Sequence, residues 1–519
     1  MNNKNLETQE QVVAEESVAT EKPAKPNKFY KSRFGKMLGL KPDTSAKTEI
    51  IAGITTFFAM CYIILVNPDQ ITGFYKYLGG EVAAIWQAVY VGTIIAAVIG
   101  TLLYAFLAKK PFAQASGMGL NSFFFTSFIL PCAITDPNKN IIGFNHLSTN
   151  YGAGLVIILL SGVIFLILSA TGLRSYIAKS LPDCLKKAIP AGIGLFIALL
   201  GLKGSFIVTD NPYTLVQLGD LTKWEIFNQY NELAGGAAPM LAAFLGFISI
   251  VIFNKSGVKF LKNMSIVLGI IVSSILFYLF TWTTPNFSFS SIGDSFTNFG
   301  NYSFSLFNGA SWAAAFDGVT IGSIFSVIVL VITFCLVDMF DTIGTLYGAS
   351  AQAGMLDANG DPIDIEKSML CDSIATCAGA LVGTSTVTTY VESASGVAEG
   401  GRTGLTALVT AGLFLVCLFL TPLASIIPGV ATAPALIYVG VLMVKNFKAV
   451  DMEDLSSAVP AFLTLILMPL TYSISNGIAV GAIAYVLIRL FTGKYSKKDI
   501  VVTVIALLFA FRYVFVNTL

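Results

Sequence analysis

The stretch Thr384-Ser-Thr-Val-Thr-Thr-Tyr-Val-Glu392 interrupts an otherwise apolar region of the chain. Its β-branched and hydroxyl-bearing residues favour an extended strand over a helix. Extended backbone inside a membrane is stable only where protein or a water-filled cavity satisfies its N–H and C=O groups. The stretch therefore predicts a short strand that lines a site within a membrane-embedded protein.

A second interruption lies in the first half of the chain, at Gln114-Ala-Ser-Gly-Met-Gly-Leu-Asn121. Two such breaks, one in each half, are typical of a midplane binding site formed between half-helices. A structural alternative is that the glycines let helices pack closely and that the threonines bond to their own helix. We favour the binding site, with the Asn121 side chain facing the cavity.

The composition places the chain in lipid. Of its 519 residues, 55% are hydrophobic and only 12% are charged, which is more apolar surface than a soluble core of this size buries. Apolar runs long enough to cross the hydrocarbon core recur along the chain, and we expect about fourteen helical spans. They lie near residues 50–66, 82–108, 113–130, 153–170, 188–202, 237–253, 265–282, 321–339, 368–381, 384–399, 405–420, 433–444, 461–470 and 477–490.

Lysine and arginine indicate the orientation of these spans, because short cytoplasmic loops retain positive charge. The loop 283–317, expected outside, contains neither residue, whereas the loops expected inside are rich in both. We expect a multi-pass protein of the cell membrane with a cytoplasmic N-terminus. Residues 1–48 are expected to be a disordered cytoplasmic tail and not a cleaved signal. Residues 500–515 form either a further span or a helix in the membrane interface.

Charge and rare residue types exclude several classes of function. A net charge of +1 provides no field that would attract nucleic acid. His146 is the single histidine and the seven cysteines form no CxxC pair, so we expect no metal site, cofactor or histidine-based catalysis. Neither a G-x-S-x-G nor an H-E-x-x-H motif occurs, and we expect no enzyme.

Three acids lie at bilayer depth, where an ionisable side chain costs at least ~2.5 kcal/mol and usually faces a cavity. Asp338 and Asp341 are three residues apart and so share a helix face. Glu392 would open a half-helix, whose dipole and free N–H groups stabilise negative charge. We expect Asp341 and Glu392 to accept hydrogen bonds from a ligand's N–H groups. The candidates for a coupled proton are Glu392, Asp341 and Asp338.

Each of these acids also has a structural interpretation. Asp338 could pair with a neighbouring hydroxyl or mark a helix end near water, and Glu392 could cap its helix. Two further charged residues, Glu399 and Arg402, are expected at the cytoplasmic exit of the same half-helix, where we favour a solvated or ion-paired state.

Four motifs resemble the AzgA-like hypoxanthine, guanine and adenine permeases, which belong to the nucleobase/ascorbate transporter superfamily. The motifs are residues 48–58 running on to 66–68, Gly117-Met-Gly-Leu-Asn121, residues 337–346 and residues 383–404. The resemblance extends over nearly the whole chain from Lys47 onward, and the last motif is too long to be a chance similarity.

The resemblance implies an all-α polytopic membrane protein, with about fourteen transmembrane segments in an inverted repeat of seven plus seven. Two short strands, around residues 115–119 and 385–391 in the third and tenth segments, would meet at the midplane. A core domain would comprise residues 49–171 and 319–422. A gate domain would comprise residues 186–282 and 427–516, including the C-terminal apolar segment.

The resemblance also implies a secondary active transporter that imports purine bases by proton symport, with elevator-type alternating access. In the family the base is held by residues that match Asn121, Asp341 and Glu392. The expected partners are a purine base, protons and the lipid bilayer, and a homodimer is compatible with the resemblance. The alternative is an anion transporter or channel of the sulfate-transporter type on the same architecture. Half-helix N-termini suit an anion, but carboxylates beside them would repel it. The preferred purine is left open.

Overall fold

The computed structural model describes residues 28–135, 141–172, 180–211, 214–227, 233–285, 287–316, 321–358 and 362–515, most of them helical. Residues 1–27 of the expected tail lie outside these ranges. In the remainder of that segment Arg33–Met37 form helix α2, and Leu38 and Leu40 are buried against the ends of neighbouring helices. Apolar contact therefore holds this part of the tail against the protein, in place of the disorder expected for it.

Nine helices in the described ranges are long and apolar enough to cross a membrane. They comprise α3 with α4 (Ala46–Met60, Ile63–Ile71), α5 with η3 (Gly80–Leu103, Tyr104–Ala108), α7 (Leu147–Ala170), α9 (Asp183–Gly204), α10 (Ala237–Lys255), residues 327–347 of α15 (Ile321–Ala353), α18 with η8 and α19 (Gly404–Val416, Cys417–Leu420, Thr421–Ser425), α20 with η9 (Gly429–Val444, Lys445–Ala449) and α22 (Ile474–Phe491). Shorter helices between these segments include α6 (Met118–Phe124), α12 (Ser265–Thr281), α16 (Ile365–Leu381), α17 (Ser393–Ala398) and α21 (Leu455–Leu470), and α23 (Ile500–Phe515) follows α22. The chain is a predominantly helical membrane protein.

Two strands from opposite halves of the chain pair inside the helical body. Strand β1 (Gln114–Ser116) runs antiparallel to β8 (Val387–Thr389), with Ala115 opposite Thr388. All residues of both strands are buried. Backbone bonds continue the pairing beyond the strands, since Gly117 N–H donates to Thr386 at 3.0 Å. The observed strands are shorter than the extended segments expected from the sequence, and each leads into a short helix, α6 or α17.

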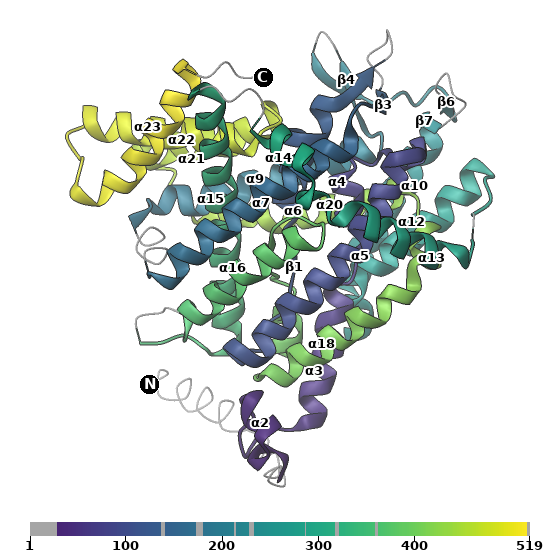
Figure 1. The fold of residues 1–519 in the computed structure, drawn as a ribbon, viewed down its shortest axis with the longest axis horizontal. Coiled ribbons are helices and arrows are strands. Elements are labelled where there is room, and N and C mark those ends of the chain that lie inside the picture. The colour runs from purple at the N-terminus through teal and green to yellow at the C-terminus, as the bar shows by residue number, and fades with distance from the viewer. Residues whose placement is uncertain are drawn as a thin grey trace, which may run out of the picture.

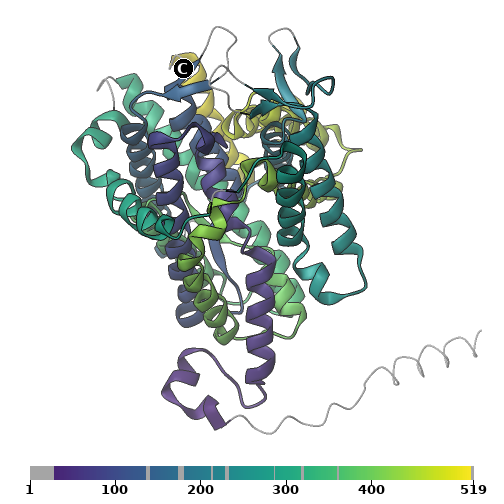
Figure 2. The ribbon, with the colours of Figure 1, turned by 90° about the vertical axis from the view of Figure 1, so that its right-hand side faces the viewer.

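Segments from the two halves of the chain also pack side by side. Helix α18 lies against α3 and α5, and α20 lies against α9 (Figure 1). The β-hairpins β2–β3, β4–β5 and β6–β7 lie at one end of the molecule and α2 at the other (Figure 2). Their strands are Ala133–Thr135, Ile141–Phe144, Val208–Asn211, Leu215–Leu218, Ile226–Phe227 and Leu233–Gly235. The hairpins therefore belong to loops on one side of the helical bundle.

Close backbone contact at Gly92 generates a first prediction. A Cβ atom at Gly92 of α5 would lie 2.4 Å from the carbonyl oxygen of Val382, at the end of α16. Backbone cannot retract as a side chain can, so we expect Gly92→Ala to cost about 1–3 kcal/mol of stability. The measurement is the melting temperature of the purified protein in detergent.

Gly412→Ala on α18 is the matched control, because nothing lies within 4 Å of the added methyl. Alanine is the better helix former by up to about 1 kcal/mol, so this variant should melt at the same or a higher temperature. Equal melting temperatures for the two variants would show that α5 and α16 are not in close contact at Gly92.

Candidate functional site

Glu392 follows the end of strand β8 and begins the short helix α17. Its carboxylate Oε1 accepts a hydrogen bond from the Tyr62 hydroxyl at 2.6 Å. The side chain makes no capping bond to α17. The first two N–H groups of that helix donate instead to carbonyls at the end of the preceding segment, at 3.2 and 3.0 Å. The helix N–H groups expected to hold Glu392 are therefore already in use, and a tyrosine holds it.

Asp341 lies on α15, beside the turn that follows β1. A Cβ atom at Gly117 would lie 3.6 Å from the Asp341 carboxylate and 2.5 Å from the methyl group of Thr388 on β8. Glu392 lies near enough to Asp341 and to Tyr438 of α20 for an electrostatic interaction with each. Asp341 and Glu392 are both only partly buried. The strand pair thus brings together two of the three residues that the sequence selects for ligand binding.

Asn121, the third of these residues, is completely enclosed on α6, with 0% of its surface exposed. Its Nδ2 donates to Gln70 Oε1 of α4 at 3.2 Å, and its Oδ1 accepts from the Ser385 hydroxyl. Gln70 in turn donates to Ser122 at 3.0 Å. Asn121 therefore joins α4, α6 and the segment that leads into β8. A ligand could bond to its amide only after Gln70 or Ser385 had moved.

Asp338, the remaining proton candidate, is buried on α15 and supports the strand pair. Its Oδ2 accepts a hydrogen bond from the Thr376 hydroxyl of α16 at 3.0 Å. The same hydroxyl accepts a hydrogen bond from the N–H of Val387 on β8 at 3.2 Å, and the Val387 carbonyl, also 3.2 Å away, competes with Asp338 for its single proton. This is the hydroxyl pairing considered as the structural interpretation of Asp338. Asp338 thus acts on β8 through Thr376.

Asp372 is a buried acid that the sequence reasoning missed. It lies on α16 and is 0% exposed. Its carboxylate accepts from Gln114 of β1 at 3.1 Å and from the Thr342 hydroxyl, next to Asp341, at 2.7 Å. An acid within an expected membrane span was the available signal, because burial of an ionisable group is costly. Asp372 links strand β1 to the helix that carries Asp341.

Glu49 is a second buried acid that was missed, and it holds the loop after α17. Its carboxylate accepts from the backbone N–H groups of Arg402 and Thr403 at 3.0 and 3.2 Å and from the Thr406 hydroxyl at 2.5 Å. The Arg402 guanidinium donates to two backbone carbonyls, at 2.6 and 2.7 Å. Glu399 forms a 3.5 Å ion pair with Lys259, in line with the ion-paired state favoured for it.

Comparison with known proteins shows the family to which the chain belongs. A model of a family described as a permease family matches residues 47–480. The chain belongs to this permease family. The adenine permease AdeP of Escherichia coli K12 is 36% identical over 91% of this chain and 94% of its own length. The guanine/hypoxanthine permease PbuG of Bacillus subtilis 168 is 36% identical over 91% of this chain and 98% of its own.

These relatives confirm the resemblance to nucleobase permeases. The family and these relatives are permeases, which confirms the expectation that the chain is a transporter and not an enzyme. Among solved structures, the transmembrane domain of the cyanobacterial bicarbonate transporter BicA matches with a TM-score of 0.53 and 15% identity. The match covers 83% of this chain and 97% of that domain. At so low an identity the likeness shows a shared fold alone.

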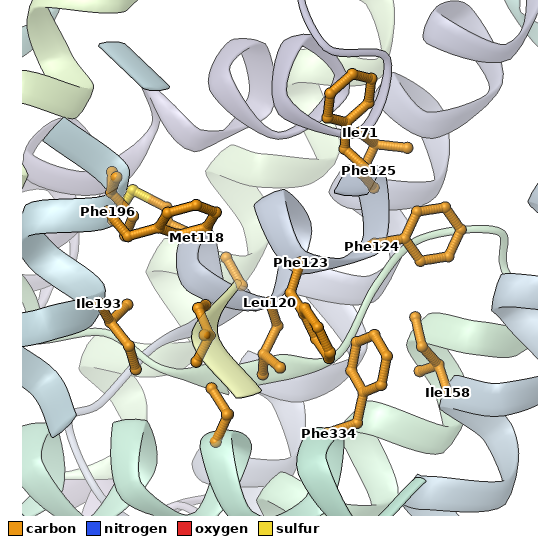
Figure 3. Close-up of a cluster of buried hydrophobic side chains, with 14 of the residues drawn as sticks. Ile71, Met118, Leu120, Phe123, Phe124, Phe125, Ile158, Ile193, Phe196 and Phe334 are labelled. Carbon is orange, nitrogen blue, oxygen red and sulfur yellow. The ribbon is translucent and has the colours of Figure 1, made fainter. Parts of the chain in front are cut away.

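An apolar cluster fixes the short helix α6 of the permease beside the strand pair (Figure 3). The ring of Phe123 lies 4.8 Å from that of Phe334 on α15, centre to centre. On the other side Gly119 lets Ile193 of α9 approach, since a Cβ at Gly119 would lie 2.5 Å from its methyl group. Because α6 is too short to be stable alone, this burial positions the end of β1.

The Thr376 hydroxyl provides a test of the strand support. Thr376→Val keeps the shape of the side chain but deprives Asp338 and the Val387 N–H of a partner. We expect a loss of about 1–3 kcal/mol of stability, seen as a lower melting temperature in detergent. The control is Thr171→Val at the exposed end of α7, where the hydroxyl bonds its own helix at Ile167, 2.9 Å away. If both variants melted like the wild type, Thr376 would not support β8.

Proposed function

We propose that this permease imports purine nucleobases into the cytoplasm together with protons. The observation that carries the proposal is the pair of partly buried carboxylates, Asp341 and Glu392, beside the β1–β8 strand pair. Purine bases are neutral and offer ring and exocyclic N–H donors, and bonds from such donors to a carboxylate are among the stronger ones available. The named activities of AdeP and PbuG, adenine and guanine/hypoxanthine permeation, support the same class of substrate.

The proposal includes the architecture implied by the sequence. Adding five shorter segments to the nine long helices gives about fourteen, in two sets of seven. The added segments are β1 with α6, α12, α16, β8 with α17, and α21. Residues 49–171 and 319–422 would form a core that moves as an elevator against a gate of residues 186–282 and 427–516. The contact of α9 with α20, each with an internal proline (Pro190, Pro434), fits corresponding members of two repeats.

We further propose that the N-terminus is cytoplasmic. The distribution of Lys and Arg supports this orientation, because short cytoplasmic loops carry an excess of these residues. Asn121 would contribute to the base site after rearrangement of its present partners. Glu392, Asp341 and Asp338 remain the candidates for the coupled proton, and the partial burial of the first two favours them over Asp338.

An anion transporter is the second candidate, because BicA shares the fold. Two carboxylates beside the strand pair would repel an anion, and described basic side chains do not form an ion pair with either of them. Electrostatics therefore favour a neutral ligand.

Uptake by proteoliposomes separates the two candidates. We expect labelled hypoxanthine, guanine or adenine to accumulate, and labelled sulfate and bicarbonate to stay at the level of protein-free liposomes. Saturable uptake of an anion without uptake of any purine would reject the proposed function.

Proton coupling is tested by comparing purine uptake under a proton gradient with uptake under a sodium gradient. We expect purine accumulation with an inward proton gradient and its loss with a protonophore, since the site offers titratable carboxylates. A sodium cage would need several converging oxygen ligands, which the two carboxylates alone do not supply. Full accumulation in the presence of a protonophore and a sodium gradient would contradict proton symport.

Glu392→Gln tests the site itself. The substitution keeps the size of the side chain but removes its charge, so purine binding should weaken by roughly 2 kcal/mol, about thirtyfold. The pH dependence of binding should flatten if Glu392 carries the coupled proton. Asp341→Asn should cause a separate loss, and the two should not be additive because both groups hold one ligand. Calorimetry on purified protein at several pH values provides the measurement.

The matched control is Glu399→Gln, which removes a carboxylate that pairs with Lys259 near the surface. We expect this variant to bind purines like the wild type. If Glu392→Gln also bound guanine, hypoxanthine and adenine like the wild type, the site would lie elsewhere.

A further inference from the structure

Tyr62 occupies the point where the first membrane-crossing segment breaks. Helix α3 ends at Met60 and α4 begins at Ile63, with Tyr62 between them. Its side chain is 1% exposed. The hydroxyl lies 2.6 Å from Glu392 Oε1 and 3.9 Å from the sulfur of Met118, the first residue of α6. The break therefore brings one hydroxyl to the starts of both short helices.

The backbone around Tyr62 is fixed on both sides. Cys61 N–H donates to Phe57 at 2.8 Å and Val66 N–H donates to Tyr62 at 3.0 Å, so the break remains continuous with α3 and α4. One end of α3 is anchored as well, because Glu49 holds the loop that follows α17. The first membrane-crossing segment thus contacts the Glu392 segment at two places, through Glu49 of α3 and through Tyr62 at the break.

We propose that Tyr62 is a positioning residue for Glu392, one that occupies Oε1 and leaves Oε2 to receive a single N–H of the base. This rests on the proposed function. Within the described part of the chain, Tyr62 is the one side chain that donates to the Glu392 carboxylate. A hydrogen bond to one oxygen restricts rotation of the carboxylate, and therefore narrows the range of directions from which a ligand N–H can approach the other oxygen.

The contact can persist when Glu392 takes up a proton. A phenol hydroxyl donates to an ionised carboxylate, and its oxygen can accept from a protonated one. Tyr62 therefore orients the carboxyl group in both charge states and need not leave during proton coupling. Because its ring is almost entirely enclosed, Tyr62 cannot itself stack on the base. It acts on the ligand through Glu392.

Tyr62→Phe tests the proposal, with Tyr90→Phe as the matched control. Tyr90 is also about 1% exposed, and its hydroxyl donates to the Cys417 carbonyl at 2.8 Å, which involves none of the acids of the site. We expect Tyr62→Phe to weaken binding of hypoxanthine, guanine or adenine about tenfold, as for a hydrogen bond to a charged group. Tyr90→Phe should leave affinity unchanged, even if it melts at a lower temperature.

A double-mutant cycle distinguishes positioning from an independent effect. In a Glu392→Gln background the Tyr62→Phe substitution should change purine affinity by less than about twofold, because its target has been altered. The same tenfold loss in both backgrounds, or no loss in the first, would overturn the proposal.

An infrared measurement makes the result independent of purine transport. The carboxyl bands of Glu392 are those that disappear in Glu392→Gln. Tyr62→Phe should shift these bands and Tyr90→Phe should not, whether or not any purine binds. Shifted bands in a protein that binds no purine would reject the proposed function but retain the Tyr62–Glu392 contact, whereas unshifted bands would reject the contact itself.

Discussion

Two extended segments enclosed in an apolar protein body must satisfy their backbone N–H and C=O groups, and β1 and β8 do so chiefly with each other. Side chains satisfy strand backbone groups that the pairing leaves without a partner. The Thr101 hydroxyl bonds the backbone of Gln114, and the Tyr390 hydroxyl donates to the Ser116 carbonyl at 2.5 Å. Once the pair is fixed, the two short helices that follow must start beside it. The position of Glu392, at the start of one of them, is thereby set.

Five acids near the strand pair and helix α17 fall into two groups that differ in burial. Asp338, Asp372 and Glu49 are buried and accept hydrogen bonds from hydroxyl, amide or backbone donors, so each joins two or more segments. Asp341 and Glu392 are only partly buried. A buried polar group without a partner is costly, so the first group is explained by structure alone. The second group retains a surface that a ligand can reach, which is the physical ground for assigning function to it.

Sequence alone predicted the class of protein, the family and both extended breaks, because composition and a long motif carry that information. It also selected Asp341 and Glu392. It could not identify Tyr62, whose partner Glu392 lies 330 positions away, because one apolar span gives no indication of which residue faces it. Its position within an expected span marked Asp372 as unusual, but the sequence could not show that its partners are Gln114 and Thr342, which lie on other segments. Helix N–H groups were expected to stabilise Glu392, but the turn leading into α17 uses them.

A further acid, Asp69, joins helix α4 to helices α5 and α20. Asp69 of α4 is 0% exposed and accepts from Trp86 of α5 at 2.6 Å and from the Thr432 hydroxyl of α20 at 2.7 Å. If α20 slides against α4, the bond to Thr432 must break while that to Trp86 can remain. A hydrogen bond to a charged group is worth about 1.5–3 kcal/mol. Lys76 reduces the free-energy cost of breaking this bond, because its ammonium group lies 3.6 Å from the Asp69 carboxylate and remains paired with it. The contact therefore favours the described arrangement of α4 and α20.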